Sequence, residues 1–168
     1  HKITVIDNRF ISERVNQIRN WNMEFVQGDI LDKDLINKIC KDADVVHHLA
    51  GITDVPRTKN ESSNSHDEKI KEVAEVGTQN ILNAINHRCK IVFPSTHVVY
   101  EGIKEVRTDI KEDEITKPVL SYSSSKAVNE DQLKKSGKNF VILRLGSVYG
   151  YSTDSMRIDI MPNLFSKI

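Results

Sequence analysis

The sequence of 168 residues has no long apolar run and only two cysteines. No apolar stretch approaches the roughly 20 residues that span a bilayer, and the first residues, HKITVIDN, lack the apolar region of a signal peptide. Cys40 and Cys89 show no CxxC spacing and no neighbouring His/Cys cluster, which favours buried reduced thiols over a disulfide framework. These absences predict a cytoplasmic protein that makes no membrane contact.

An excess of either charge is also missing, because Lys plus Arg and Asp plus Glu each number 24. No overall electric field would draw such a chain to nucleic acid or to an anionic membrane, so we expect neither as a partner. The length and the 38% of hydrophobic residues suit a single buried core. Partners must therefore be inferred from individual sites.

Short apolar runs alternate with longer charged stretches, a pattern typical of repeated βα units. The runs predict strands over residues 3–6, 24–26, 45–49, 91–94 and 140–144. Helical spacing of aliphatic and capping residues predicts helices over residues 31–41, 68–86 and 121–135. Residues 52–66 and 102–118 read as long surface loops, which often carry function. The predicted fold is α/β, a doubly wound parallel sheet with helices on both faces.

Tyr122 and Lys126 lie four residues apart on the last predicted helix, so the phenol and the ammonium share one face. A tyrosine with an ordinary pKa of about 10 is a poor base at neutral pH, and a nearby cation favours its phenolate. The spacing alone is weak, because solvated helix faces often carry such pairs by chance. Its context therefore decides whether Tyr122 is a base and Lys126 its partner.

Polar residues end two predicted strands, and in open α/β sheets ligands bind at such ends. Ser95 and Thr96 close one strand, where a hydroxyl can hold a substrate oxygen, although a simple strand-terminal turn is the alternative. Asp7, followed by Asn8, ends the first strand, as expected of a carboxylate that accepts hydrogen bonds from an adenosine ribose. Such an acid repels a 2'-phosphate and favours NAD over NADP, although Arg9 nearby could serve a phosphate.

Asp29 and Ile30 follow the second predicted strand. Asp29 can accept from an adenine amino group while Ile30 packs on the ring. A helix N-cap, supplied by Asp29 or Asp32, explains an acid here equally well.

Leu49, Ala50 and Gly51 follow the third predicted strand, and small residues there let a cofactor approach the backbone closely. The adjacent pair His47 and His48 suggests a metal at first sight. Neighbouring strand residues face opposite ways, however, so we expect no metal site.

In their order along the chain, these features resemble the extended short-chain dehydrogenase/reductase family, which includes nucleotide-sugar epimerases and dehydratases. The resemblance covers nearly the whole chain and rests on Asp7, Gly28 to Ile30, His48 to Gly51, Gly77 to Asn80, Ser95-Thr96 with Val99-Tyr100, Tyr122 to Lys126, Leu143-Arg144 and Val148 to Gly150. It implies a Rossmann-like fold that binds NAD. It further implies that Thr96 binds the reacting hydroxyl, that Tyr122 takes its proton, and that Lys126 also holds the nicotinamide ribose.

The resemblance also bears on the substrate, for which it implies a nucleotide-sugar and hydride transfer at sugar C4. In sugar dehydratases an acid pair follows the active-site threonine, whereas this chain has His97 and Val98. Valine cannot move a proton, which favours an epimerase or reductase over a dehydratase. Thr96, His97 and Ser147 are the expected substrate contacts, although His97 can equally be a structural histidine.

Two alternatives remain open within the same fold. One is a reductase of a steroid, flavonoid or other carbonyl compound, and the other is a cofactor-binding sensor without catalysis. A homodimer formed through helices is implied by the resemblance alone.

The family opens with a strand and a GxxGxxG turn that holds the pyrophosphate, and no such turn occurs in these residues. We therefore expect part of a longer protein. Residues 1–150 would form the NAD-binding domain without its first strand and glycine-rich turn, and residues 151–168 would begin the substrate-binding region.

Overall fold

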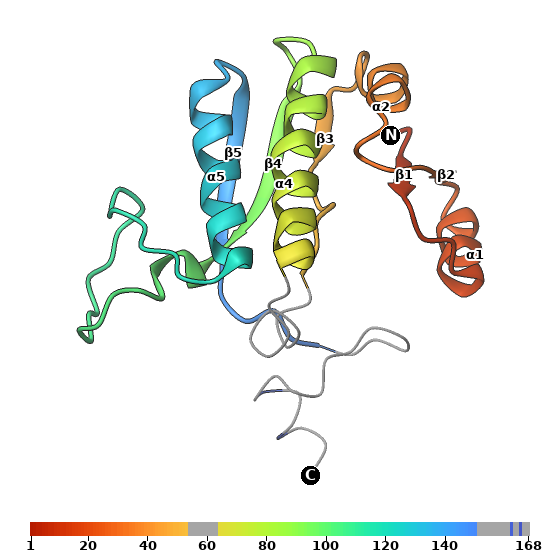
Figure 1. Ribbon diagram of the computed structural model, residues 1–168. Helices are drawn as coiled ribbons and strands as arrows, with labels where there is room; N and C mark the ends of the chain where they lie inside the picture. The colour runs from red at the N-terminus through yellow and green to blue at the C-terminus, as the bar shows by residue number, and fades with distance from the viewer. Residues whose placement is uncertain (54–63, 151–161, 163–164, 166–168) are drawn as a thin grey trace.

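The computed structural model describes residues 1–53 and 64–150, together with Pro162 and Phe165 (Figure 1). Strands and helices alternate as predicted. Their order within these residues is β1 (Thr4–Asp7), α1 (Ser12–Asn20), β2 (Glu24–Gln27), α2 (Lys33–Cys40), β3 (Val45–His47), α4 (Asn64–Ala84), β4 (Lys90–Thr96), the 3-10 turn η1 (His97–Tyr100), α5 (Ser121–Lys135) and β5 (Asn139–Leu145).

All strand pairs are parallel, which confirms the predicted α/β class. β1 pairs with β2, while β4 lies between β3 and β5 and aligns with β5 from Lys90 opposite Asn139 to Thr96 opposite Leu145. The sequence predicted one sheet. Within the described residues there are two, because no described strand pairs with both β1 and β3.

α4 and α5 lie side by side against one face of the three-stranded sheet (Figure 1). Ile91 and Phe93 of β4 point into this layer and are fully buried. Val141 and Leu143 of β5 point the other way and are 39% and 40% exposed, so the described helices leave that face of the sheet open. α2 packs on α4, and α1 packs on β2.

The hydrophobic core lies between the sheet and the helices α2, α4 and α5. Both cysteines belong to it, as predicted, and burial raises the pKa of the thiols of Cys40 and Cys89. The buried cluster consists of Ile30, Ile36, Cys40, Ile81, Leu82, Ala84, Ile85, Cys89, Ile91, Phe93 and Leu133.

The helix α1 was not predicted, because its sequence SERVNQIRN is mostly polar and only Val15 is buried. Some predicted ends were also wrong. The third strand stops at His47 rather than at residue 49, and α4 begins at Asn64, inside the loop predicted over residues 52–66. Residues 54–63 of that loop lie outside the described residues. The predicted loop over residues 102–118 is confirmed, and no described helix is both long and apolar enough to cross a membrane.

Candidate functional site

The carboxyl ends of the parallel strands carry most of the predicted site residues. β4 ends at Thr96, which is 8% exposed and points away from the layer that receives Ser95, because side chains alternate along a strand. The Thr96 hydroxyl accepts a hydrogen bond from the Val98 amide at 3.3 Å and so begins η1. This edge of the sheet therefore presents a side-chain hydroxyl on a rigid strand end.

Tyr122 and Lys126 lie on the first two turns of α5, as predicted. The Lys126 ammonium is 6.0 Å from the centre of the Tyr122 ring, which confirms that the two groups share a helix face. Tyr122 is half-buried, whereas Lys126 is 8% exposed. The ammonium is therefore the more buried member of the pair.

The Lys126 ammonium also ties α5 to β4. It donates to the Pro94 carbonyl at 3.0 Å and lies 4.6 Å from the centre of the Phe93 ring. Burial lowers the pKa of Lys126 to about 8, so the group is still mainly charged at neutral pH. The charge is thus fixed two residues before Thr96.

His48 lies beside Phe93, with ring centres 5.3 Å apart, and is 2% exposed. Its Nε2 is 2.8 Å from the Thr78 hydroxyl, and its Nδ1 has no hydrogen-bond partner among the described residues. Burial, together with the nearby charge of Lys126, lowers the pKa of His48 to about 4 and keeps the ring neutral. His47 faces solvent, so the pair does point in opposite directions, and the described residues contain no cluster that could hold a metal ion.

A buried ion pair supports the same region from behind. Glu130, 1% exposed, accepts from the Ser95 hydroxyl at 2.6 Å and from Arg144 Nη2 at 2.6 Å. Burial opposes the charge of Glu130, but the bonds from Arg144 and Ser95 outweigh it and hold the pKa of this carboxyl below its usual value. Arg144 in turn contacts the Tyr100 hydroxyl and donates to the Glu112 carbonyl at 2.9 Å. β4, η1, α5 and β5 are joined through these contacts.

The role of Glu130 was missed from the sequence. It lies four residues after Lys126 and eight after Tyr122, so the helical period that indicated the pair extends to it. A charged residue on the helix face of Tyr122 and Lys126 was the signal from which a role in the site could have been predicted.

Asp7, Asn8 and Asp29 meet at the carboxyl ends of β1 and β2. The Asn8 side chain donates to Asp29 at 3.1 Å, and Asp7 accepts from the Arg9 amide at 2.8 Å. The hydrogen bond from the Leu31 amide, with that from Asn8, lowers the pKa of Asp29. These polar groups predicted to bind the adenosine are therefore neighbours, and both Asp7 and Asn8 are exposed.

Ile30 lies in the hydrophobic core and Asp32 caps a helix, and both positions bear on the predicted adenine contacts. Ile30 is 8% exposed and packs in the core against Gly77, where a Cβ would come within 2.8 Å of it. Asp32 is the N-cap of α2 and accepts from the Leu35 amide at 3.0 Å. The alternative of a cap is thus correct for Asp32, while contacts of Asp29 and Ile30 with adenine stay predictions.

Leu49, Ala50 and Gly51 are exposed just after β3, and a Cβ built on Gly51 would meet nothing within 4 Å. His97 and Ser147 are also exposed, at the ends of β4 and β5. His97 Nδ1 lies 3.1 Å from the Leu145 carbonyl, which can only accept, so Nδ1 carries the proton. Contacts of these five residues with a cofactor or substrate stay predictions.

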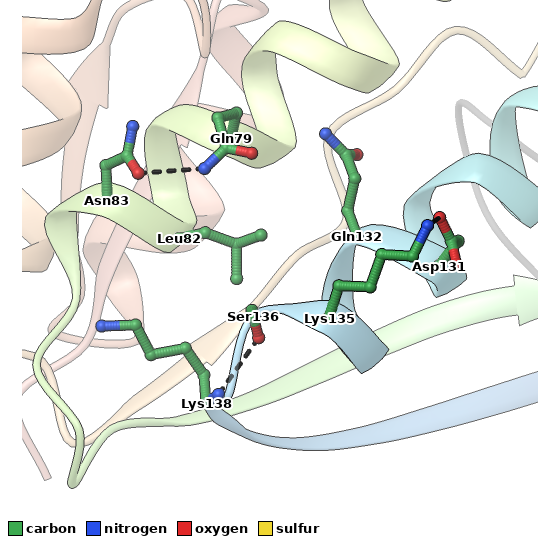
Figure 2. Close-up of a pocket in the computed structure, with 8 residues that line it drawn as sticks. All are labelled: Gln79, Leu82, Asn83, Asp131, Gln132, Lys135, Ser136 and Lys138. Carbon is green, nitrogen blue, oxygen red and sulfur yellow. Dashed lines mark hydrogen bonds and ion pairs between the residues drawn. The ribbon is translucent and has the colours of Figure 1, made fainter.

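A separate cavity of about 470 Å³ lies between the C-terminal parts of α4 and α5 (Figure 2). Gln79, Leu82 and Asn83 line it from α4, and Gln132 and Lys135 line it from α5. This end of α5 is opposite to the one that carries Tyr122. The cavity therefore takes no part in the candidate site.

Parallel strands with polar groups at their carboxyl ends define an α/β protein with the usual ligand-binding edge of such sheets. The profile of the NAD dependent epimerase/dehydratase family matches residues 1–168. The chain belongs to that family.

Two curated relatives and one solved structure show which members of the family this chain is similar to. A putative UDP-glucose 4-epimerase of Methanocaldococcus jannaschii is 31% identical over 92% of this chain and 50% of its own length. A dTDP-D-glucose 4,6-dehydratase of Dictyostelium discoideum is 29% identical over 89% of this chain and 38% of its own. The structure of UDP-glucuronic acid 4-epimerase from Bacillus cereus, in complex with UDP-glucuronic acid and NAD, has a TM-score of 0.72 at 27% identity and covers 96% of this chain and 52% of that one. The chain thus spans half or less of the curated relatives described here.

Proposed function

We propose that this chain is the NAD-binding and catalytic part of a nucleotide-sugar epimerase or reductase that acts at sugar C4. The observation that carries the proposal is the buried Lys126 ammonium, held by Pro94 at the end of β4 and 6.0 Å from the Tyr122 ring centre. Membership of the NAD dependent epimerase/dehydratase family supports the cofactor and the class of reaction. The binding of nucleotide-sugars and NAD by the Bacillus cereus enzyme supports the substrate class.

The residues present fit NAD. The exposed carboxylate of Asp7 can accept from ribose hydroxyls, with Asn8 and Asp29 beside it. The exposed backbone of Leu49 to Gly51 leaves room for a close approach, and Lys126 has two ammonium protons beyond the one given to Pro94. When bound, NAD accepts a hydride from the substrate carbon.

In this mechanism Thr96 donates to or accepts from the reacting hydroxyl and fixes its orientation. Tyr122, as phenolate, takes the hydroxyl proton while the carbon loses its hydride, so a ketone and a neutral phenol result. The Lys126 charge favours the phenolate without moving a proton itself. Return of the proton and the hydride to the opposite face of the ketone completes epimerisation. A reductase would instead start from a keto-sugar, with the hydride supplied by reduced cofactor and the proton by the Tyr122 phenol.

The test is the substitution Tyr122→Phe in the full-length protein. It removes the proton acceptor, so turnover of a panel of UDP- and dTDP-sugars should fall by at least about 100-fold. NAD binding, measured by calorimetry, should persist. Lys126→Met should also reduce turnover, whereas the matched control Lys135→Met, exposed on the same helix, should not. Full activity of Tyr122→Phe would refute the proposal.

Elimination is the less favoured reaction on the residues that follow Thr96. Val98 has no proton to exchange, and the His97 Nδ1 proton faces the Leu145 carbonyl. Product analysis should accordingly detect an epimer or a reduced sugar. Formation of a 4-keto-6-deoxy sugar would show that the chain acts as a dehydratase, as its Dictyostelium relative is named.

A homodimer is proposed for the full-length protein on the surface of α4 and α5. Val76 of α4 and Val128 of α5 are 47% and 38% exposed, which leaves apolar side chains on these helices for a partner. Sedimentation analysis of the full-length protein should give twice the monomer mass. A monomer at micromolar concentration would contradict it.

A further inference from the structure

Glu101 lies directly after η1, and its carboxylate reaches across to the start of α5. Oε1 accepts from the Val119 amide at 2.8 Å and from the Leu120 amide at 2.7 Å, and the Ser123 hydroxyl donates to the same oxygen. These three donors lie 18 to 22 positions after Glu101 in the sequence, and all of them meet at one carboxylate oxygen. The contact belongs to neither the core nor the ion pair of Glu130.

The N-cap residue of α5 is Leu120, whose side chain cannot accept a hydrogen bond. The Leu120 amide donates to Glu101 at 2.7 Å and to the Ser123 hydroxyl at 3.2 Å, so Glu101 is its shorter contact. The first amides of a helix have no partner within the helix, and an acid near them is favourable. Glu101 supplies from another segment an acceptor for the amide of the N-cap residue, as a Glu or Gln at N3 does within a capping box.

The backbone around Glu101 is fixed by two further hydrogen bonds. The Gly102 amide donates to the Lys117 carbonyl at 2.8 Å, and the Lys117 amide donates to the Val99 carbonyl at 2.8 Å. A Cβ at Gly102 would come within 2.6 Å of that Lys117 carbonyl oxygen, so only glycine permits this approach without a shift of the backbone. Both ends of the loop 102–118 are therefore joined beside Glu101.

Glu101 also stands between the two groups of the proposed reaction. Thr96 lies five residues before it, at the end of β4, with η1 as the short connection. Tyr122 lies between Leu120, the N-cap residue, and Ser123 of α5, and both of these residues donate to Glu101. Loss of these contacts would free the first turn of α5, and a shift of that turn would change the position of the Tyr122 phenol relative to Thr96 and to Lys126 on the second turn.

We infer that Glu101 is a positioning residue, which holds the first turn of α5 so that Tyr122 meets the substrate hydroxyl held by Thr96. This inference rests on the proposed function. The oxygen acts as an acceptor, so its position matters more than its charge. Glutamine, which keeps a carbonyl oxygen at the same reach, should therefore replace glutamate far better than alanine does.

The first measurement needs no knowledge of the substrate. The pKa of the Tyr122 phenol is measured in the full-length protein with NAD, from the phenolate absorbance as the pH rises. For each Glu101 variant, the absorbance of the same variant carrying Tyr122→Phe is subtracted, so that only Tyr122 contributes. Glu101→Ala and Glu101→Gln remove the same charge, so their difference reports position alone. The Tyr122 midpoint should be higher in Glu101→Ala, because the phenol is less well placed beside Lys126. Equal midpoints in the two variants would overturn the inference.

The second measurement is steady-state turnover of the nucleotide-sugar found active in the panel. Glu101→Ala should lower kcat on the order of tenfold with KM and the Kd of NAD little changed, because misplacement of a reacting group affects the chemical step. Glu101→Gln should recover most of the loss, and the control Glu105→Ala, exposed in the same loop, should equal the wild type. A raised KM with unchanged kcat would count against positioning.

Two checks keep the outcome interpretable. If Glu101→Ala does not fold by circular dichroism, Glu101→Asp takes its place and is compared with the wild type, since both carry the charge and only the oxygen is drawn back by one methylene. If Tyr122→Phe itself retains full activity, the proposed function fails. If Tyr122→Phe is inactive while Glu101→Ala matches Glu101→Gln in both measurements, only the positioning role fails.

Discussion

The two ends of the candidate site are constructed differently. Around α5 and β4, charged side chains are largely buried and have fixed partners: Lys126 donates to Pro94, and Glu130 pairs with Arg144. At the carboxyl ends of β1 and β2, Asp7 and Asn8 are exposed. The Asp7 side chain accepts from the nearby Arg9 amide, and the Asn8 side chain donates to Asp29 after the neighbouring strand. The end proposed for chemistry is thus preorganised, whereas the end proposed for the adenosine depends on exposed groups that ligand contacts can complete.

The largest expected difference between the two ends concerns Glu130. Glu130→Ala leaves Arg144 buried without its carboxylate and should lower the free energy of unfolding by about 3–5 kcal/mol. The matched control is Asp131→Ala on the same helix, whose pair with Lys135 is exposed and should contribute below about 1 kcal/mol. Urea unfolding monitored by circular dichroism measures both. Equal effects would show that burial of the network does not distinguish this end.

The second prediction concerns the pH dependence contributed by Lys126. Its pKa falls from 10.5 to about 8 on folding because the ammonium is buried, so between these values the unfolded chain binds more protons than the native state. Stability from this group therefore rises with pH across that window and is lowest below pH 8. Relative to Lys126→Met, the wild type should gain on the order of 3 kcal/mol between pH 8 and 10.5, measured by urea unfolding. A difference independent of pH would contradict the desolvation of this ammonium.

The smallest effect is expected at the exposed end. Asn8→Ala removes one of the two hydrogen bonds that lower the pKa of Asp29, so this pKa should move up toward its ordinary value. Because the folded pKa is the lower one, the stabilising contribution is present above the unfolded pKa and is lost as the pH falls through the folded pKa. The change in unfolding free energy at neutral pH should be at most about 0.5 kcal/mol. NMR titration of the Asp29 carboxyl group measures the shift, and an unchanged pKa would show that the Leu31 amide alone sets it.

Several parts of the fold could be predicted because they depend on local patterns. The helix α5 has the predicted bounds, and its C-terminal end carries its own signals in Lys134, Lys135 and Gly137, the last with a φ of +66°. The strands were found from their apolar runs. The helix α1 was missed because one buried residue, Val15, gives too little periodicity. The start of α4 was missed for the same kind of reason, since its first turn, Asn64 to Asp67, is polar.

The site could be predicted only as far as its separate motifs. The spacing of Tyr122 and Lys126 indicated a shared helix face, and the alternation of His47 and His48 indicated opposite orientations. No local pattern in the sequence indicated a role for Glu101. Its contacts join residues about 20 positions apart, and no local pattern encodes such a distance.

By itself, the sequence determined the alternation of strands and helices, the class of fold, and the pairing of Tyr122 with Lys126, because these follow from short-range periodicity and side-chain chemistry. Only the tertiary structure decided that Lys126 donates to Pro94, that Glu130 holds Arg144 and Ser95, and that Glu101 supports the start of α5. Those contacts depend on which strand ends and helix starts the parallel sheet brings together. Their strength depends on burial, which exists only once the chain has folded.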